Sequence, residues 1–564
     1  MFKYKLLLGF LFLFTIQTVS AQDPQLSDSE LTMRSVTETP FAAVKLSHNP
    51  VDGNLYLITQ DGNVVRVDIE SGSTTTLQTV DDHSLEDVQG LDISDEGHFF
   101  IVGNVKNEED ATNTSFLKKG IADEDGNWEW ITIAEMAPYP LSNTDFDHIM
   151  NEVVLSPDNK YAYINSGSRT DHGEVQSVDG KYPGLRETAL TAKILKIPTD
   201  SVGLYLEDDL NYLQENGFIH AEGTRNSFGL NFDGEGRLFS ADNAGERDDP
   251  GEFNWLQEGK HYGFPWRIGG NDTPMQFDDY DPSEDMLLTT DSRSEIFYND
   301  PDYPAPPQGI EFVEPILNYG PDGVNYKDAN TGEVFDASEQ DTAISSFTAH
   351  RSSLGLVFDS DSALIGDYTG DGFVLAFTGG NDGAFLLQHM NDPGEDLLHL
   401  ELTASGDTFT MQSTRIAQGF LNPIDSEIIE NKIYVMEFTN SWLNNPSPWD
   451  DARSTQIWEI TFPQNSTTTE RAGEGIAHSI ELSQNYPNPF NPSTSISFEL
   501  PTSGKVSLNV FDMLGREVQE LVNGYQAAGS HEVRFNAQNL PSGMYIYRLK
   551  TGTVELTRKM MLIK

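Results

Sequence analysis

Short apolar runs of alternating character follow one another along residues 35–462 of this chain, with no helical stretch of note between them. Each repeat has a small residue, an apolar strand, a turn rich in Asp, Asn or Gly, and a second apolar strand. Alternation with a period of two between such turns is typical of antiparallel hairpins. Six copies of one hairpin unit predict an all-β fold, a six-bladed β-propeller. The units begin at Ala43, Gly90, Val153, Gly229, Gly355 and Pro423.

The spacing of these units predicts one insertion in a propeller domain that we assign to residues 22–462. The fourth and fifth units start 126 residues apart, whereas the other spacings are 47 to 76 residues. The additional segment, about 271–342, is rich in Asp and Pro, which predicts irregular loops with short strands. Long loops on a rigid ring often carry binding sites, although a merely solvated excursion is an equal alternative.

A second series of alternating strands occupies residues 480–564, including 495–500 and 506–512. Gly, Pro and Asn punctuate the strands, so we expect a small C-terminal β-sandwich. The polar, Gly-containing segment 463–479 is the expected linker between the two domains.

The N-terminus has the pattern of an export signal. Lys3 and Lys5 precede an apolar run of eleven residues, 6–16, and small residues at 19–21 suggest cleavage after Ala21. A membrane-spanning helix needs about 20 apolar residues, so we interpret residues 1–21 as a signal peptide and expect no transmembrane segment in the mature chain. A retained membrane anchor is the alternative.

The charge balance limits the possible partners. The chain has 89 acidic and 34 basic residues, a net charge of −55, and almost all of the excess lies in the propeller region. Such a surface repels phosphate, so nucleic acid is not an expected partner. The excess can reflect a saline habitat or several calcium sites. The absence of cysteine excludes disulfides, thiolate nucleophiles and Cys-ligated zinc.

The C-terminal module carries a recognisable signature. Residues 482–492 read Leu-Ser-Gln-Asn-Tyr-Pro-Asn-Pro-Phe-Asn-Pro, and residues 559–564 read Lys-Met-Met-Leu-Ile-Lys. Together with the landmarks at 528–531 and 540–549, this module resembles the type A sorting domain of the type IX secretion system. The resemblance implies the type IX machinery as a partner, passage through the periplasm, and a secreted or cell-surface protein. An unrelated β domain that binds carbohydrate or docks to the propeller is the alternative.

Residues 145–266 resemble the soluble glucose/sorbosone dehydrogenase family, in segments 148–163, 191–197, 225–230 and 252–266. Members of this family are six-bladed propellers, and many use pyrroloquinoline quinone (PQQ) and calcium. Alcohol oxidation by a quinone needs a base for the hydroxyl proton while hydride leaves the same carbon. By position, the resemblance makes His148 that base and Arg225 the group that stabilises developing negative charge.

The resemblance also implies further ligands. It places Asn226 and Asn243 against the cofactor, and a weaker likeness at 350–356 adds Arg351 as a cation that could contact it. The backbone carbonyls of Ala244 and Gly245 would bind the calcium ion next to the cofactor. Glu252 and the backbone of Tyr262 match a structural calcium site. Calcium prefers about 6 to 8 oxygen ligands, which the acidic stretch 241–252 can offer, although such a stretch is as often a solvated loop.

The chain departs from the family pattern at several of these positions. The family's Gly-Pro is Ala244-Gly245, and an expected Asp before Glu252 is Gly251. The arginines that hold the carboxylates of the cofactor have no counterpart in 417–422, and a lysine expected after residue 373 is missing. A tricarboxylate in a strongly acidic protein needs such cations. Arg169, Arg247 or Arg351 could replace them, or the cofactor has been lost.

Two functions remain open. The first is an exported quinone-dependent dehydrogenase that oxidises an aldose or related polyol by hydride transfer to PQQ. The second is a non-catalytic, calcium-stabilised propeller that binds glycans or a protein partner. We find no paired carboxylates that would support a hydrolase.

Overall fold

The computed structural model describes residues 23–123, 125–144, 146–288, 300–378, 387–438 and 454–463, together with much of 481–564. In that last range, it leaves out 483–484, 486–489, 491, 501–503, 513–515, 527–528, 539, 542 and 552–553. The chain forms two compact units, residues 1–465 and 466–564. The predicted signal peptide and nearly all of the predicted linker lie outside the described residues, so both stay predictions.

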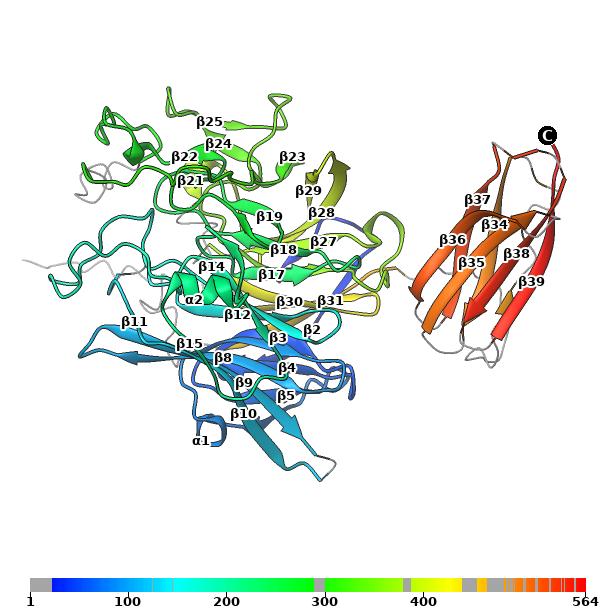
Figure 1. Cartoon of the computed structure of the whole chain (residues 1–564), viewed down its shortest axis with the longest axis horizontal. Helices are drawn as coiled ribbons and strands as arrows, with labels where there is room; N and C mark the ends of the chain where they lie inside the picture. Colours follow the sequence, from blue (N-terminus) through cyan, green and yellow to red (C-terminus); the bar gives the residue numbers. More distant parts are fainter. Residues whose placement is uncertain are drawn as a thin grey trace, which may run out of the picture. The chain divides into compact units, whose positions relative to one another are not determined.

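The first unit contains six sheets of three or more strands among its described residues (Figure 1). The first sheet has β3 (Ala43–His48), β4 (Leu55–Thr59), β5 (Val64–Val67) and β6 (Thr74–Gln78). The second has β7 (Val88–Ile93), β8 (Phe99–Asn107), β9 (Thr112–Ala122), β10 (Trp128–Met136), β11 (Tyr139–Pro140) and β15 (Leu204–Leu206). The third has β12 (Met150–Leu155), β13 (Tyr161–Ser166), β14 (Lys193–Pro198), β16 (Ile219–Glu222) and β20 (Lys260–His261).

The other three sheets follow the same order from a first strand outwards. The fourth has β17 (Gly229–Phe232), β18 (Leu238–Asp242) and β19 (Glu252–Leu256). The fifth has β26 (Ser353–Phe358), β27 (Gly372–Ala376), β28 (Asp396–Ser405), β29 (Thr408–Gln418), β1 (Gln25–Leu26) and β23 (Leu317–Pro321). The sixth has β30 (Pro423–Ile429), β31 (Lys432–Phe438), β32 (Thr455–Thr461) and β2 (Thr32–Thr39).

The first strands of these sheets form a closed ring. β3 contacts β7, and the contacts continue through β12, β17, β26 and β30 back to β3. The N-terminal strand β2 completes the sixth sheet. It pairs antiparallel with β32 from Thr32↔Thr461 to Thr39↔Thr455 and so joins the beginning of the ring to its end. The predicted all-β, propeller-like fold is therefore confirmed.

Crowding at the centre of the ring explains the glycines Gly90 and Gly229 that open two of the repeats. A Cβ atom on Gly90 would lie 3.0 Å from the backbone nitrogen of Val153 in the next sheet. One on Gly229 would lie 3.1 Å from Cβ of Leu356. First strands such as β3 and β26 are almost wholly buried, since neighbouring sheets cover both of their faces, whereas outer strands such as β9 alternate.

The antiparallel order of each sheet brings several loops to one edge of the ring. The chain enters each first strand at this edge and returns to it between the second and third strands. Residues 148, 225–226 and 350–351 precede first strands, and residues 243–251 link β18 to β19. We call this edge of the ring the entry face. The predicted site residues lie in its loops, except Glu252 and Tyr262, which follow the loop between β18 and β19.

The remaining elements are short. Two helices, α1 (Val80–His83) and α2 (Leu210–Glu215), lie between strands. The described parts of 271–342 contain β22 (Asn271–Asp272), which pairs with β21 (Arg267–Ile268), then η1 (Pro274–Gln276), β23, β24 (Asn325–Lys327) and β25 (Val334–Asp336). Two further turns are η4 (Gly366–Tyr368) and η5 (Gln388–Met390). No helix of the described chain has the length and apolar character needed to cross a membrane.

The second unit is the expected sandwich. One sheet has β33 (Glu481–Leu482), β34 (Ser493–Leu500) and β37 (Gly529–Asn536). The other has β36 (Glu517–Gln526), β35 (Gly504–Asp512), β38 (Gly543–Thr551) and β39 (Val554–Leu562). Apolar side chains of both sheets, among them Phe498 and Tyr547, form one buried cluster between them.

Candidate functional site

His148 lies directly before β12 and is held by the loop that follows β13. Its Nδ1 is 3.1 Å from the carbonyl oxygen of Ser168, and its backbone N–H donates to the same oxygen at 3.0 Å. The Ser168 hydroxyl is also 3.2 Å from Nδ1 and donates to the carbonyl of Thr170 at 2.8 Å, and the ring has a further hydrogen bond to the backbone of Phe146. With its proton on Nδ1, the neutral ring carries the lone pair on Nε2. Burial and the nearby Arg225 guanidinium lower the pKa of His148 to about 3. The imidazole is therefore neutral at physiological pH and has an unprotonated nitrogen, but a pKa this low makes it a weak base.

A backbone cradle fixes the position of this ring. A Cβ atom on Gly167 would lie 2.4 Å from Cβ of His148, a distance that only glycine avoids. The Asn151 amide donates to the carbonyl of His148 at 3.0 Å and to Oδ1 of Asn226 at 2.9 Å. The backbone N–H of Ser168 donates to the carbonyl of Arg225 at 2.7 Å. The structure thus brings His148, Arg225 and Asn226 together at the entry face.

Arg225 is buried, and its guanidinium is fully engaged. Nε donates to the carbonyl of Asp171 at 2.8 Å, and Nη2 lies 3.0 Å from the Asp171 carboxylate. Nη1 donates to the carbonyls of Asn243 (3.1 Å) and Ala244 (2.9 Å). Against the effect of burial, a hydrogen bond from His172 and the charge of Arg225 hold the pKa of Asp171 well below its usual range. Asp171 is therefore an ionised counterion that neutralises Arg225.

One of the two predicted calcium carbonyls next to the cofactor, that of Ala244, is occupied by this arginine. Ala244 offers its carbonyl to Arg225, and a Cβ atom on Gly245 would lie 2.5 Å from Oδ1 of Asp171. A cation bound at these carbonyls would be close to a guanidinium, which is electrostatically unfavourable. Asn243, expected to face the cofactor, has a buried Oδ1 without a partner among the described residues. The donor set at Ala244 and Gly245 does not fit calcium in this conformation.

Glu252 has surroundings that do fit a cation. Its carboxylate accepts from the backbone N–H of Gly269 at 2.7 Å and from the Asn254 amide at 2.9 Å. Burial and the neighbouring Asp242 raise the pKa of Glu252 to about 8, and burial raises the pKa of Asp242 to about 6. Both carboxylates line a cavity of about 10 Å³, enough for one water-sized ion, together with Arg225 and Arg267. Two buried carboxylates suit a hard ion such as calcium, and when ionised their charges would offset those of Arg225 and Arg267 on the same cavity.

Tyr262, the other predicted ligand of that site, is buried and does not line this cavity. Its N–H donates to the carbonyl of Glu222 at 2.8 Å, and its hydroxyl donates to the carbonyl of Trp255 at 2.7 Å. These contacts fix the chain after β20. The structure shows no contact between Tyr262 and Glu252.

Arg351 precedes β26 and is committed to structural ion pairs. Nη1 lies 2.6 Å from Asp392, and Nη2 makes a short hydrogen bond to Asp396. All three side chains are buried. A cofactor that contacted Arg351, as predicted, would have to displace one of these two carboxylates from the guanidinium.

The other candidate cations are also engaged. Arg169 is buried and donates to backbone carbonyls, among them that of Leu141 at 2.8 Å. Arg247 pairs with Asp249 at 2.6 Å and with Asp285 at 2.8 Å. The cavities lined by Arg247, Arg225 and Arg351 have volumes of about 10 to 50 Å³, whereas sites for molecules of PQQ's size are about 300 Å³ or larger. The described residues fit a base for alcohol oxidation but do not fit a bound tricarboxylate.

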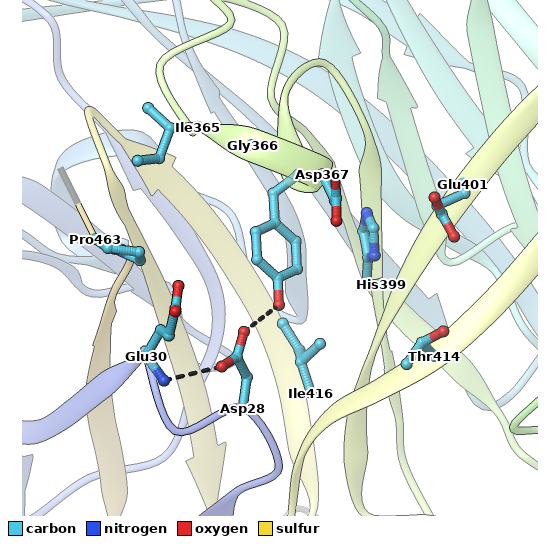
Figure 2. Close-up of a pocket in the computed structure, with 11 residues that line it drawn as sticks. Asp28, Glu30, Ile365, Gly366, Asp367, His399, Glu401, Thr414, Ile416 and Pro463 are labelled. Atoms are coloured by element: carbon cyan, nitrogen blue, oxygen red, sulfur yellow. Dashed lines mark hydrogen bonds between the residues drawn. The ribbon is translucent and has the colours of Figure 1, made fainter. Parts of the chain in front are cut away.

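A roomier cavity of about 380 Å³ lies away from the predicted site (Figure 2). It is lined by four carboxylates, together with Tyr368 and His399. Tyr368 donates to Asp28 at 2.7 Å, which ties the N-terminal segment to the fifth sheet. None of the predicted site residues lines this cavity.

Comparisons with known proteins agree with both resemblances. Residues 39–287 match the sequence model of the glucose/sorbosone dehydrogenase family, and residues 484–564 match that of the secretion system C-terminal sorting domain. Residues 39–287 are thus similar in sequence to the glucose/sorbosone dehydrogenase family. The sorting domain marks the chain as an exported protein that is secreted or held at the cell surface. Among curated proteins, none matches the chain.

Solved structures similar to this glucose/sorbosone dehydrogenase domain have low sequence identity. The PQQ-bound aldose sugar dehydrogenase of Streptomyces coelicolor is 14% identical, with 77% of this chain and 99% of that chain covered and a TM-score of 0.43. The apo aldose sugar dehydrogenase of Escherichia coli is also 14% identical, with 77% and 100% covered and a TM-score of 0.46. The PQQ domain of pyranose dehydrogenase from Coprinopsis cinerea is 12% identical, with 78% and 98% covered and a TM-score of 0.44.

Asp171 is the residue of this site that the sequence reasoning missed. It lies in the segment between β13 and β14, outside every family-like segment, and 54 residues before its partner Arg225. The only available signal was the acidic pair Asp171 and Glu174 around His172, close to the family-like segment 148–163.

Proposed function

We propose that the propeller is a dehydrogenase of the glucose/sorbosone type, which oxidises an alcohol group of an aldose or related polyol with PQQ as the oxidant. The family match over residues 39–287 supports this class of reaction. The observation that carries it is the neutral, firmly held imidazole of His148 beside Arg225 and Asn226 at the entry face.

In this proposal His148 performs the proton transfer. With Nδ1 donating to the Ser168 carbonyl, Nε2 accepts the proton of the substrate hydroxyl. Arg225 disfavours the protonated ring by its charge, which keeps the imidazole unprotonated before substrate binds and also lowers its basicity. A quinone, when bound, supplies the acceptor for the hydride that leaves the same carbon. Because the described cations do not fit the quinone's carboxylates, we assign no side chain to that acceptor.

A second function is favoured by the same ion pairs. A calcium-stabilised propeller that binds glycans or a protein partner, without redox chemistry, needs no free cation at the entry face. The commitment of Arg225 to Asp171 and of Arg351 to Asp392 and Asp396 agrees with this reading. The cation-compatible cavity at Glu252 suits both functions.

One experiment separates the two functions. The purified full chain is incubated with PQQ and Ca²⁺, and reduction of a redox dye is followed with a panel of aldoses and polyols. The dehydrogenase predicts turnover with at least one sugar, loss of turnover in His148→Gln, and retention in His220→Gln, a buried imidazole near the carbonyl of Leu256 at 3.3 Å. Absence of turnover, or equal turnover in His148→Gln, would reject the enzyme and favour the binding protein.

We also propose the route of export. A leader of residues 1–21 would be removed on entry to the periplasm, and the type IX machinery would recognise residues 480–564. Removal of 480–564 should leave the protein in the periplasm, which cell fractionation detects. Surface exposure of the truncated chain would contradict this route.

A further inference from the structure

Two histidines and an aspartate meet at the entry face, away from His148. Asp248 lies in the loop between β18 and β19, His350 precedes β26, and His389 is in η5 between β27 and β28. They come from sequence positions 102 and 141 residues apart, and the fold alone brings them together. None of the functions considered above uses them.

Their polar atoms converge on one point. Nε2 of His350 is 2.7 Å from Oδ1 of Asp248, and Nε2 of His389 is 2.8 Å from the same oxygen. One ligand atom from each residue lies within 4.8 Å of the other two. The two imidazole rings are 5.6 Å apart between centroids and are inclined at 53°. This is a compact set of two nitrogen ligands and one oxygen ligand.

Such a set selects the kind of ion. Calcium and magnesium prefer oxygen ligands alone, whereas imidazole suits zinc, copper, iron and nickel. Two histidines and a carboxylate leave coordination positions open for water or a substrate. The exposure of the side chains rises from 0% at Asp248 through 14% at His350 to 39% at His389, so the open side of the set faces solvent.

The surrounding chain holds the three residues in place. Lys327 of β24 lies 2.6 Å from Oδ2 of Asp248, so the second carboxylate oxygen is fixed and Oδ1 is directed at the histidines. Contacts of this kind around a metal ligand orient it and tune its affinity. Asn325 of the same strand donates to the carbonyl of Met390, next to His389, at 2.9 Å.

The backbones of both histidines rest on one apolar cluster. Ala349, Leu387 and Met390 are buried together, so the residues beside His350 and His389 share a single support. His350 itself has φ +64°, a left-handed conformation that is uncommon for a non-glycine residue and is found often at functional sites. The set is therefore organised before any ion arrives.

We infer that Asp248, His350 and His389 bind a divalent transition-metal ion of the zinc class, with Lys327 as the residue that positions the carboxylate. The inference goes beyond the proposed dehydrogenase and holds for either function. It also assigns a role to the insertion 271–342, because Asn325 and Lys327 both belong to it. The alternative is a hydrogen-bonded cluster in which both imidazoles donate to Asp248 and no ion binds.

Titration of the full-length protein distinguishes these outcomes. After dialysis against a chelator, Zn²⁺ alone and then Co²⁺ alone are added, with calorimetry and a competing chelator for affinity and the visible absorption of Co²⁺ for the ligand set. We expect one tight site per chain, and at least about tenfold weaker binding in Asp248→Asn, His350→Gln and His389→Gln. Lys327→Met should weaken binding less than loss of a ligand does.

His399 and Asp371 provide a matched control. Nε2 of His399 is 2.9 Å from Oδ2 of Asp371, and among the described residues no second imidazole is paired with this carboxylate. His399→Gln should bind both ions as the unchanged protein does. His389 is the most exposed of the three ligands, so His389→Gln should keep the circular dichroism spectrum and the Tm, measured without metal. Binding that is absent, that is unchanged in all three ligand variants, or that Ca²⁺ satisfies equally well would overturn the inference.

Discussion

Removal of one negative charge from Asp171 should make the entry face accept an anionic cofactor. Asp171→Asn replaces the carboxylate that neutralises Arg225 with an amide of nearly the same size. The carboxylate oxygen Oδ1 is 3.0 Å from Nη2 of Arg225 and accepts from the backbone N–H of Glu246 at 3.0 Å. An amide oxygen can accept both hydrogen bonds, and the amide NH₂ can donate to Nδ1 of His172, 2.9 Å from the other carboxylate oxygen, in the matching tautomer, so we expect the loop to keep its conformation.

The size of the effect follows from the geometry. Two unit charges about 3 Å apart attract by about 5 kcal/mol at an effective dielectric constant of about 20. Both side chains are buried, so solvent screens the pair only weakly. If an incoming carboxylate of PQQ recovers about a quarter of this energy, its Kd falls about tenfold. In the unchanged protein, the same carboxylate has to displace Asp171.

Equilibrium binding of PQQ, measured by fluorescence with Ca²⁺ present, tests this expectation. Asp171→Asn should bind PQQ at least about tenfold more tightly than the unchanged protein, and the gain should shrink as salt is raised. The control is Asp233→Asn, which removes the same charge from a pair with Arg237 (2.6 Å) at the opposite end of β17. Equal affinity in Asp171→Asn and the unchanged protein, or an equal gain in the control, would refute the reasoning.

Three further predictions concern buried charges of the ring. Lys45 bridges carboxylates of different sheets, including Glu152, so Lys45→Met should lower the free energy of unfolding by about 3–5 kcal/mol in urea, and Glu152→Gln in the same chain should restore part of it. An unchanged urea midpoint in Lys45→Met would contradict this role. Burial raises the pKa of Asp92 to about 6 and that of Glu427 to about 8, above their values in the unfolded chain. Their contribution to stability is therefore complete below about pH 4, and it is lost as the pH rises through 6 for Asp92 and through 8 for Glu427. The Tm should fall between pH 5 and 9, and it should fall less steeply in Asp92→Asn. Ca²⁺ should raise the Tm of the unchanged protein and leave that of Glu252→Gln unchanged; an equal rise in both would place calcium elsewhere.

The sequence was sufficient to predict the fold because the fold depends on local patterns. Each repeat contains its own strands and turn, and the structure places β7 and β17 at the units that begin with Gly90 and Gly229. The glycines that open two of these units have a physical cause as well, since a Cβ atom at Gly90 or Gly229 would crowd the neighbouring first strand. The sequence did not predict that the N-terminal strand β2 would complete the last sheet, because that pairing joins residues more than 400 positions apart.

The candidate site was only partly predictable, for a related reason. Family-like segments located His148, Arg225 and Asn226, and the structure brings these three together. A sequence does not show which carboxylate an arginine will meet, and the partners of Arg225 and Arg351 lie far from them in the chain. The cluster of Asp248, His350 and His389 was invisible for the same reason.

The acidity of the chain connects these observations. The chain has 34 basic residues against 89 acidic ones, and the buried cations Lys45, Arg225 and Arg351 each pair with a carboxylate. Such a protein has little positive charge left to attract an anionic ligand. A dication bound by His350 and its partners would add positive charge beside the cavity that Asn243, His350 and Arg351 line together. Positive charge at the entry face would then come from bound metal ions, and the fraction bound depends on the metal concentration around the protein. The basic side chains would contribute little, because carboxylates of the fold neutralise them.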